Sequence, residues 1–308
     1  MQRVLLFLKR TSLDLPLDDA PYSVRRIANH FHERDTVHEV TIRRCKEVLD
    51  KRGLTWKSLY LDELKEAIRD VDLVVTVGGD GTFLRASHYV GSTIPILGVN
   101  SDPTRATELA TNTEFDATRS AGYLCAAVKD SFDQVLGEIF EGKRQPVLVH
   151  RIETRVNTSP LQTYALNDVL LAHPSPASVT RCTFRIYKKQ NSEPVSPYIH
   201  TRSSGLRICT GVGSTAAMRS AGGYTMAPTS TELQYMVREP IITEPSQQSF
   251  MHRIIQEDEM LEVRYTGRQG AIYIDGMYVC QNVEFGDAIK FSTNAPKLQM
   301  FLKNPGTA

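Results

Sequence analysis

Residues Leu73–Thr82 read LVVTVGGDGT, an apolar stretch that ends in a glycine-rich turn and leads into a helical pattern. The β-branched residues before the turn are typical of a strand that is buried on both faces of a parallel sheet. Glycine lets the backbone turn tightly and approach a ligand, and the first N–H groups of the next helix can hold phosphate oxygens. This stretch therefore predicts a strand–turn–helix unit that binds an anionic ligand.

The alternation of strand and helix continues on both sides of this unit. Strands are expected at Val4–Leu8, Trp56–Tyr60 and Ile96–Val99, and helical stretches at Val37–Leu49, Leu64–Ile68 and Ser120–Glu141. Strands that alternate with helices form βαβ units and a doubly wound sheet. Residues 1–145 are therefore expected to form an α/β domain with a doubly wound sheet and the glycine-rich turn.

The chain changes character after the boundary, which we place near residues 142–147. Short strand patterns separated by Pro, Ser and Asn are expected at Val147–Val156, Tyr164–Ala172, Thr180–Lys188, Gly205–Thr210, Leu261–Tyr265, Ala271–Ile274, Met277–Val279 and Ala288–Ser292. Such a series is typical of a β-sandwich. Residues 146–308 are therefore expected to form a β-rich, sandwich-like domain, with Asp275-Gly276 as a two-residue hairpin turn and a C-terminal tail that can return to the first domain.

The composition argues for a pocket rather than a charged surface. The 308 residues carry a formal net charge of +1, so no broad electrostatic field points to nucleic acid or to an anionic membrane. No apolar run approaches the roughly 18 residues of a membrane span. The five cysteines are widely spaced without a Cys-x-x-Cys pair, which favours reduced thiols and a cytoplasmic location. A peroxisomal location is the alternative, although Gly306-Thr307-Ala308 is not an address of the Ser-Lys-Leu type.

Asp80 is the unusual member of the glycine-rich turn. Phosphates repel a carboxylate unless a divalent cation screens it or the carboxylate transfers a proton. Accepting the proton of an attacking hydroxyl is a known role in phosphoryl transfer. A tight turn in which Asp80 or Thr82 caps the helix explains the turn alone equally well. The pattern is not a Walker A sequence.

Two other segments are candidate ligand-binding sites. Asn167 and Asp168 interrupt an apolar strand pattern, and an amide beside a carboxylate can hold a base edge and ribose hydroxyls. A strand end or an Asx turn is the structural alternative. In the second segment Gly213 permits close approach of a ligand, and Ser214 or Thr215 can cap a helix that faces a dinucleotide. An ordinary helix N-cap is the alternative there.

Taken together, these segments resemble the NAD kinases. Asp80 in its turn, residues 166–168 and residues 213–216 occur in the order and approximate spacing of that family. Residues 98–103 with 119–125, and residues 202–210, are similar to the plant NADH kinase branch, and metazoan mitochondrial NAD kinases show related stretches. The resemblance spans roughly residues 70–280.

The resemblance implies an enzyme that transfers the γ-phosphate of ATP to the 2′-hydroxyl of the adenosine ribose of NADH and NAD⁺, with Mg²⁺ and as a homodimer. It implies that Asp80 is the general base. The residues that it implies for binding ATP and dinucleotide are Gly79, Gly81, Thr82, Arg85, Asn100, Asn167, Asp168, Ser204, Thr215, Ala216 and Ser220. No residue is assigned as a metal ligand.

One departure from the family bears on the substrate. Ser204 stands where many members have an acid, and NAD⁺ carries a positive nicotinamide ring whereas NADH carries a neutral one. A nearby carboxylate favours the oxidised form through Coulomb attraction. We therefore hypothesise that NADH is the better substrate.

Two other functions remain open at this stage. A lipid kinase of the diacylglycerol or sphingoid type uses a related glycine-rich turn, but the weak charge and the lack of an obvious amphipathic stretch argue against it. A non-catalytic dinucleotide sensor with the same pocket is the other alternative.

Overall fold

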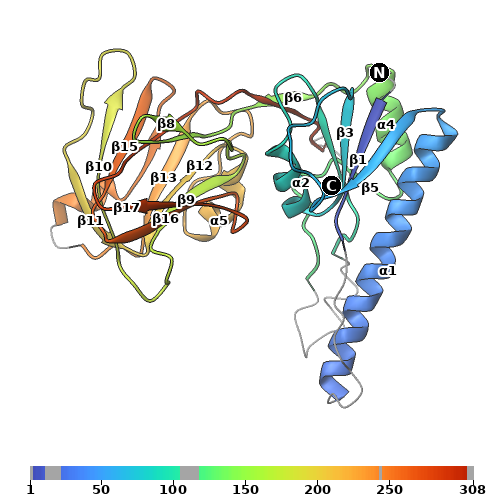
Figure 1. The fold of residues 1–308 in the computed structure, drawn as a ribbon, viewed down its shortest axis with the longest axis horizontal. Helices are drawn as coiled ribbons and strands as arrows, with labels where there is room; N and C mark the ends of the chain where they lie inside the picture. The colour runs from blue at the N-terminus through green and yellow to red at the C-terminus, as the bar shows by residue number, and fades with distance from the viewer. Residues whose placement is uncertain (1–2, 11–21, 105–117, 243–244, 304–308) are drawn as a thin grey trace. The chain divides into compact units, whose positions relative to one another are not determined.

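The computed structural model describes residues 3–10, 22–104, 118–242 and 245–303, and it divides the chain into two compact units (Figure 1). The α/β unit comprises Met1–Val147 and Gln299–Ala308, and the β unit comprises Leu148–Leu298. The C-terminal residues Gly306–Ala308 considered above lie outside the described residues. No helix within these ranges is both long and apolar enough to cross a membrane.

A largely parallel sheet forms the centre of the α/β unit. Its strands are β1 (Arg3–Leu8), β2 (Thr55–Tyr60), β3 (Leu73–Gly78), β4 (Ile96–Asn100), β5 (Ala127–Val128), β6 (Val147–Val149) and β19 (Leu298–Met300). Their order is β2-β1-β3-β4-β19-β6, with β5 beside β4. The C-terminal strand β19 pairs in parallel with β4 through Met300 and Ile96. The last strand of the chain therefore belongs to the same sheet as the first.

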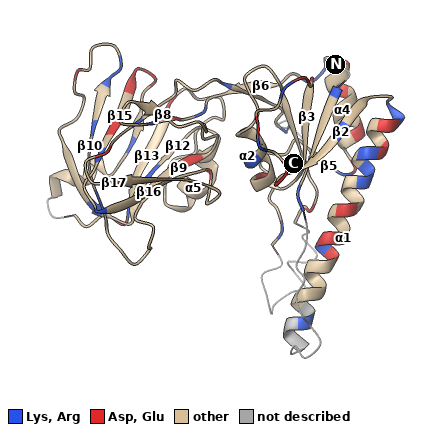
Figure 2. Cartoon of the chain, in the orientation of Figure 1, with Lys and Arg blue, Asp and Glu red and all other residues tan. Residues whose placement is uncertain are grey.

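Helices cover both faces of this sheet (Figure 1). α1 (Tyr22–Lys51) and α4 (Phe132–Phe140) pack on one face, where residues such as Cys45 and Leu136 join the core cluster. α2 (Asp80–Ser87) lies on the other face, where Phe83 packs close to Gly98 of β4. Basic and acidic residues are interspersed along the described part of α1 (Figure 2). The doubly wound α/β fold expected from the sequence is confirmed.

Two expected helices are wrong. Within the expected helix Ser120–Glu141 only α4 is helical, and the residues before it form turns and the short strand β5. The reason is tertiary, because the backbone near Ser120 is hydrogen-bonded to the loop after β4. Leu64–Ile68 also lacks a helix, and the backbone N–H of Ile68 donates instead to Tyr89.

The β unit consists of two six-stranded antiparallel sheets. The first has the order β11 (Ile199–Ser203), β10 (Thr180–Lys188), β15 (Glu259–Tyr265), β18 (Ala288–Ser292), β7 (Glu153–Val156) and β8 (Ser159–Pro160). The second has the order β14 (His252–Ile255), β13 (Leu233–Arg238), β12 (Gly205–Cys209), β9 (Asp168–Ala172), β16 (Gln269–Ile274) and β17 (Val279–Glu284). Short helices are η1 (Gly213–Thr215), α5 (Ala217–Ser220) and η2 (Pro245–Phe250).

Alternating residues of both sheets build one apolar core. Phe184 of the first sheet meets Tyr235 of the second edge to face, with ring centroids 5.3 Å apart. Side chains alternate between the faces of a strand, so the neighbours of the inward residues point away from this core. On β9, Val169 and Leu171 face the core, and Asp168 therefore lies on the opposite face, which we call the outer face of the second sheet. The sandwich-like domain expected from the sequence is confirmed.

The turn between β16 and β17 differs from its prediction. It contains the four residues Asp275–Tyr278 rather than two, and Met277 and Tyr278 belong to the turn and not to a strand. Asp275 has a φ of 49° and Gly276 a φ of 110°. The longer turn lets the Asp275 carboxylate reach the backbone at the start of β9, as described below.

Candidate active site

The glycine-rich turn links β3 to α2 without a side-chain cap. Gly79 is the N-cap residue of α2, and no side chain caps this helix by a hydrogen bond. The Thr82 side chain instead packs over Gly78, where a Cβ atom would collide with its hydroxyl. Of the two interpretations of this turn, side-chain capping is therefore wrong.

The Asp80 carboxylate is oriented by a distant segment of the chain. Its Oδ2 accepts a hydrogen bond from the backbone N–H of Tyr123 at 3.0 Å, and its Oδ1 accepts one from Leu124 at 2.8 Å. Each oxygen keeps a lone pair for a further donor. The two hydrogen bonds therefore fix the orientation of the carboxylate, and each of its oxygens can still accept a further hydrogen bond or a proton.

Asn100 and Asp102 anchor the segment that holds Asp80. The Asn100 amide donates to the carbonyl of Ser120 at 3.1 Å, and Gly122, with a φ of 64°, packs so close to Asn100 that a side chain would collide. Asp102 pairs with Arg119, whose side chain is 1% exposed. Sequence reasoning missed this connection because it expected a helix there.

A cavity of about 450 Å³ lies beside Gly79 in the α/β unit. Four cationic residues line it, namely Lys9, Arg10, Arg34 and Arg119, together with the acids Asp35 and Asp102. The loops that follow β1, β3 and β4 contribute to its wall, at the carboxyl ends of parallel strands, where ligands bind in open α/β sheets. The excess of cations suits an anionic ligand.

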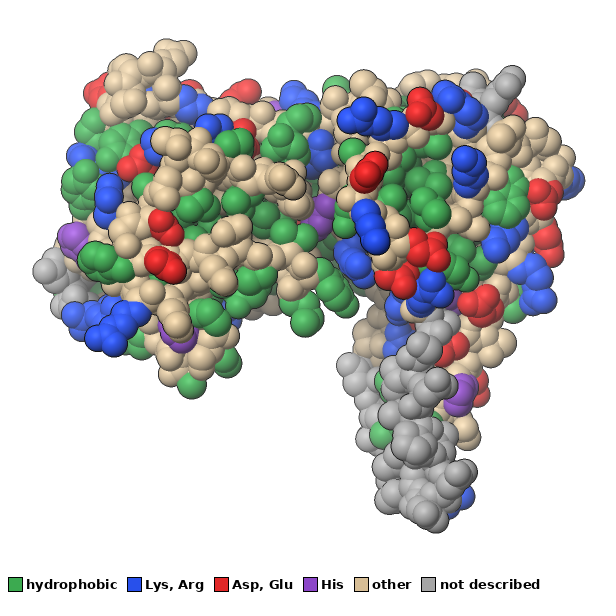
Figure 3. All heavy atoms as spheres, viewed as in Figure 1, with side chains coloured by type: hydrophobic (Ala, Val, Ile, Leu, Met, Phe, Trp, Pro, Cys, Tyr) green, Lys and Arg blue, Asp and Glu red, His purple; other side chains and the backbone are tan. Residues whose placement is uncertain are grey.

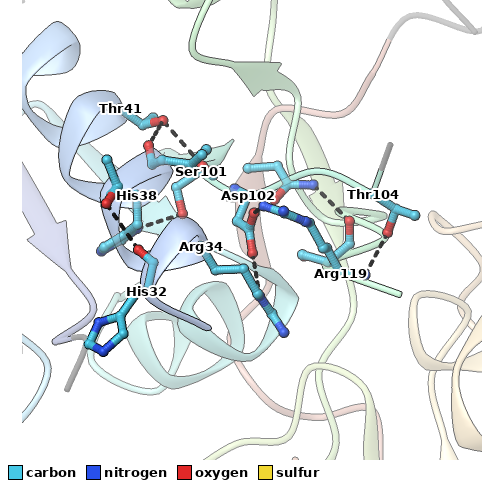
Figure 4. Close-up of polar contacts among 12 residues, drawn as sticks. His32, Arg34, His38, Thr41, Ser101, Asp102, Thr104 and Arg119 are labelled. Atoms are coloured by element: carbon cyan, nitrogen blue, oxygen red, sulfur yellow. Dashed lines mark hydrogen bonds and ion pairs between the residues drawn. The ribbon is translucent and has the colours of Figure 1, made fainter. Parts of the chain in front are cut away.

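Asp102 joins two arginines in this cavity (Figure 4). Its Oδ2 accepts from Arg34 Nε at 2.8 Å, and its Oδ1 accepts from Arg119 Nη1 at 2.5 Å. The Arg34 side chain is 28% exposed, so part of its guanidinium group remains open to the cavity. Charge-assisted bonds of this kind fix the direction of a guanidinium group.

His38 supports the same loop from α1 (Figure 4). Its Nε2 lies 3.0 Å from the carbonyl oxygen of Lys9, which can only accept, so Nε2 carries the proton. Its Nδ1 lies 2.7 Å from the Ser101 hydroxyl, which therefore donates to it. Burial lowers the pKa of His38, which keeps the ring neutral and this pattern intact at neutral pH.

In the β unit, one carboxylate fixes the backbone of Asn167 and Asp168. Asp275 Oδ2 accepts from the N–H of Leu166 at 2.7 Å, and its Oδ1 accepts from Asn167 at 2.7 Å and Asp168 at 3.0 Å. The side-chain Oδ1 of Asn167 is buried and has no hydrogen-bond partner among the residues that the structure describes. A buried oxygen of this kind is an acceptor available to a ligand.

Asp168 forms a partly buried ion pair with Arg207 of β12, with Nη1 and Oδ1 2.6 Å apart. Burial raises the pKa of Asp168 to about 6, the ion pair with Arg207 opposes this rise, and the nearby Asp275 carboxylate adds to it. The carboxyl group can therefore change its charge close to physiological pH.

The third expected segment lies directly against the second. Gly213 packs on the carbonyl of Asn167, where a Cβ atom would collide, and its N–H donates to the Thr210 hydroxyl at 3.1 Å. Thr215 and Ala216 are half-buried, and Ser220 is exposed at the end of α5. The structure thus brings residues 166–168 and 210–216 together in the β unit.

Other expected residues lie elsewhere. Ser204 sits before β12, at the end opposite Cys209, which pairs with Asp168. Five residues of strand correspond to about 16 Å, so Ser204 is far from Asp168. Arg85 is half-buried on α2 and does not line the cavity beside Gly79, whereas Gly81 is exposed in the first turn of α2.

The described residues contain no group of three or more His, Cys, Asp or Glu side chains that could hold a metal ion. On the face of the α/β unit visible in Figure 3, acidic and basic side chains are interspersed, in keeping with the net charge of +1.

Comparison with known proteins identifies relatives along most of the chain. Residues 1–116 match the family described as ATP-NAD kinase N-terminal domain. The chain is 46% identical over 278 residues to a probable NADH kinase of Oryza sativa, covering 90% of this chain and 85% of that protein. It is 43% identical over 280 residues to an NADH kinase of Arabidopsis thaliana, covering 91% and 88%.

Two solved structures share the fold. An NAD kinase from Archaeoglobus fulgidus in complex with ATP matches with a TM-score of 0.66 at 18% identity, covering 98% of this chain and 94% of that one. A yeast NADH kinase complexed with NADH matches with a TM-score of 0.69 at 16% identity, covering 99% and 84%.

Proposed function

The chain belongs to the NAD kinase family, and we propose that it transfers the γ-phosphate of ATP to the 2′-hydroxyl of the adenosine ribose of NADH, and also of NAD⁺. The observation that carries this proposal is the Asp80 carboxylate, which two backbone N–H groups hold and which follows Gly79, a residue that lines the cationic cavity. Asp80 takes the proton of the ribose hydroxyl as that oxygen attacks the γ-phosphorus. The bond from the γ-phosphorus to the bridging oxygen breaks, and ADP leaves.

The cavity beside Gly79 is suited to the phosphates of the donor. Arg34 and Lys9 offer cationic groups there, and the first turn of α2 adds backbone N–H groups near Gly81 and Thr82. Asn100 uses both ends of its amide within the chain, so we assign it to positioning rather than to ligand contact. Mg²⁺ would reach the site on the triphosphate.

The β unit is suited to the dinucleotide. The free Oδ1 of Asn167 and the Asp168 carboxylate can accept hydrogen bonds from ribose hydroxyls or a base amine. Thr215 and Ala216 would line the wall beside them, with Ser220 at its edge. The position of Ser204, far from Asp168 on β12, gives no support to a charge effect at that residue, so the preference for NADH rests on the relatives.

The proposed function is tested with purified protein, Mg-ATP and either NADH or NAD⁺, by following the 2′-phosphorylated product. Diacylglycerol and a sphingoid base serve as control acceptors. Product from neither dinucleotide would overturn the proposal, and a higher kcat/KM for NAD⁺ would overturn the preference for NADH. Homodimeric assembly and a cytoplasmic location remain predictions from the sequence.

Arg34→Met tests the role of the cavity. It removes one cation but leaves Asp102 paired with Arg119, so the fold should survive. The loss of a charge-assisted bond to phosphate should raise the KM for ATP about tenfold. The KM for NADH should not change, and steady-state kinetics with each substrate varied in turn measure both.

Arg44→Met is the matched control for this change. Arg44 lies on the same helix, is 45% exposed and makes a long contact of 3.8 Å with Glu47. It should leave both KM values unaltered. An equal rise of the KM for ATP in both variants would show that the rise comes from a disturbance of α1 as a whole and not from the loss of a cation in the cavity.

The raised pKa of Asp168 predicts a pH dependence. As the pH falls through about 6, the free protein takes up a proton at Asp168 and loses an anionic acceptor, so dinucleotide affinity should decline below pH 6 and level off above it. Calorimetric titrations with NADH between pH 5 and about 8 measure this profile. Asp168→Asn should bind more weakly at neutral pH and lose the dependence. An identical profile in both proteins would show that another group titrates.

A further inference from the structure

An exposed tyrosine in the β unit is held by an unusually complete set of hydrogen bonds. The Tyr224 side chain is 61% exposed in the loop after α5. Gln234 of β13, which is fully buried, accepts from the Tyr224 N–H at 2.7 Å and donates to the Tyr224 carbonyl at 2.8 Å. The Gln234 amide therefore fixes the backbone of Tyr224 from both sides, as a neighbouring strand would.

The ring of Tyr224 is fixed as well. It stacks on the ring of His252, with centroids 4.6 Å apart and an angle of 24° between the planes. His252 Nε2 lies 2.7 Å from Gln234 Oε1, which already accepts from Tyr224, so Nε2 carries a proton and donates. One buried glutamine thus orients both rings of the stack.

Glycine is required for this arrangement. A Cβ atom at Gly223 would lie 2.6 Å from Met218 Cγ and 2.7 Å from Gln234 Oε1. The same loop is attached to η1, because the N–H of Met226 donates to the Ser214 hydroxyl at 2.8 Å. The loop that carries Tyr224 is therefore bound to the segment that packs on Asn167.

The strand register places Gln234, which holds this tyrosine, on the same face of the sheet as Asp168. Gln234 pairs with Cys209, and Cys209 pairs with Asp168, so the three side chains share the outer face of the second sheet. Two strand spacings separate Gln234 from Asp168 by about 10 Å. His252, on which the Tyr224 ring stacks, belongs to β14, one strand further from Asp168, so a dinucleotide rather than a single nucleoside has the length to contact both Tyr224 and Asp168.

We propose that the Tyr224 ring, supported by His252 and locked by Gln234, is a stacking platform for a flat heteroaromatic base of the dinucleotide, on the same sheet as Asp168. This inference rests on the proposed dinucleotide substrate. Because the ring is already immobilised, little side-chain entropy is lost when a base stacks on it. The ring is therefore a preorganised contact. Tyr224 is then a residue that determines base affinity rather than one that takes part in phosphoryl transfer.

Tyr224→Leu and Tyr224→Phe test the platform, with calorimetric binding of NADH as the main measurement. Loss of the ring in the leucine variant should raise the Kd for NADH by about tenfold or more, because stacking of a base on an aromatic side chain is worth that much. The phenylalanine variant should bind like the wild type, and the KM for ATP should be unchanged in both. ADP-ribose and reduced nicotinamide mononucleotide, tested separately, identify which base stacks.

Tyr198→Leu is the matched control, because Tyr198 is 60% exposed but lies next to β11 in the first sheet. It should leave NADH binding unaltered. Tyr224→Trp gives a second readout that does not depend on the leucine variant folding. Trp56 of the α/β unit is the single tryptophan of the chain, so NADH should quench additional emission from the introduced indole.

A Tyr224→Leu protein that is folded and binds NADH as the wild type does would overturn the platform. So would an indole at this position whose emission NADH leaves unaltered, or an equal loss in Tyr198→Leu. A wild-type protein that phosphorylates neither NADH nor NAD⁺ would overturn the proposed function instead. The two failures are therefore distinguishable.

Discussion

Asp80→Asn should lower turnover by about 100-fold or more, the usual scale for loss of a general base, while NADH still binds. The amide keeps the size of the carboxylate but cannot take the proton of the ribose hydroxyl. Single-turnover measurements with saturating Mg-ATP report the chemical step, and calorimetry reports binding. Turnover within a few-fold of the wild type would remove Asp80 from this role.

A structural effect of this substitution must be separated from the chemical one. The amide keeps only one acceptor oxygen, so either the Tyr123 or the Leu124 N–H loses its partner. Thermal unfolding shows whether the segment is disturbed. The control is Ser120→Ala, which removes a hydroxyl next to Gly79 but leaves both bonds to Asp80 in place. A 100-fold loss of turnover in Ser120→Ala as well would show that the loss in Asp80→Asn comes from disturbance of the segment that holds Asp80 and not from loss of the base.

Asp275→Asn should destabilise the β unit by about 3 kcal/mol and weaken NADH binding at least tenfold. Its carboxylate accepts three backbone N–H groups at the start of β9, and the amide would turn an NH₂ group toward at least one of them. Asn167 and Asp168 would then lose their fixed orientation. Urea unfolding measures the first effect, and calorimetry with NADH measures the second.

Asp258→Asn is the control for the loss of one aspartate charge in the β unit. Asp258 pairs with Lys188 at 2.7 Å, but its side chain is 55% exposed, and such surface pairs contribute about 1 kcal/mol or less. It should bind NADH like the wild type. If Asp275→Asn were no more destabilising than this control, the three hydrogen bonds would not hold β9 in place.

The sequence predicts the sheets well because their signals are local. The run Leu73–Val77 is buried on both faces and is recognisable from its own residues. In the β unit the inward and outward residues alternate, as on β9, where Val169 and Leu171 face the core and Asp168 faces away from it. Turn geometry is less local: the turn at Asp275 has four residues, and its carboxylate is hydrogen-bonded to backbone that lies over 100 residues earlier.

The candidate site could be predicted only in part, for the same reason. Asp80, Asn167 and Asp168 stand in compact motifs. Arg34 and Arg119 do not, because they come from the middle of a long helix and from an irregular segment. Both bind Asp102, which lies 68 residues from Arg34 and 17 residues from Arg119 in the sequence. No local sequence pattern predicts these contacts.

The place of β19 has a consequence for how the protein is made on the ribosome. β19 lies between β4 and β6 in the sheet of the α/β unit, yet it is the last of the described strands to be synthesised. The whole β unit emerges before this position can be filled. During translation the nascent α/β unit therefore exposes the part of the β4 edge that β5 does not cover, a template for unwanted pairing, until β19 leaves the exit tunnel. The β unit can complete its two sheets in that interval, so it can fold before the sheet of the α/β unit is complete.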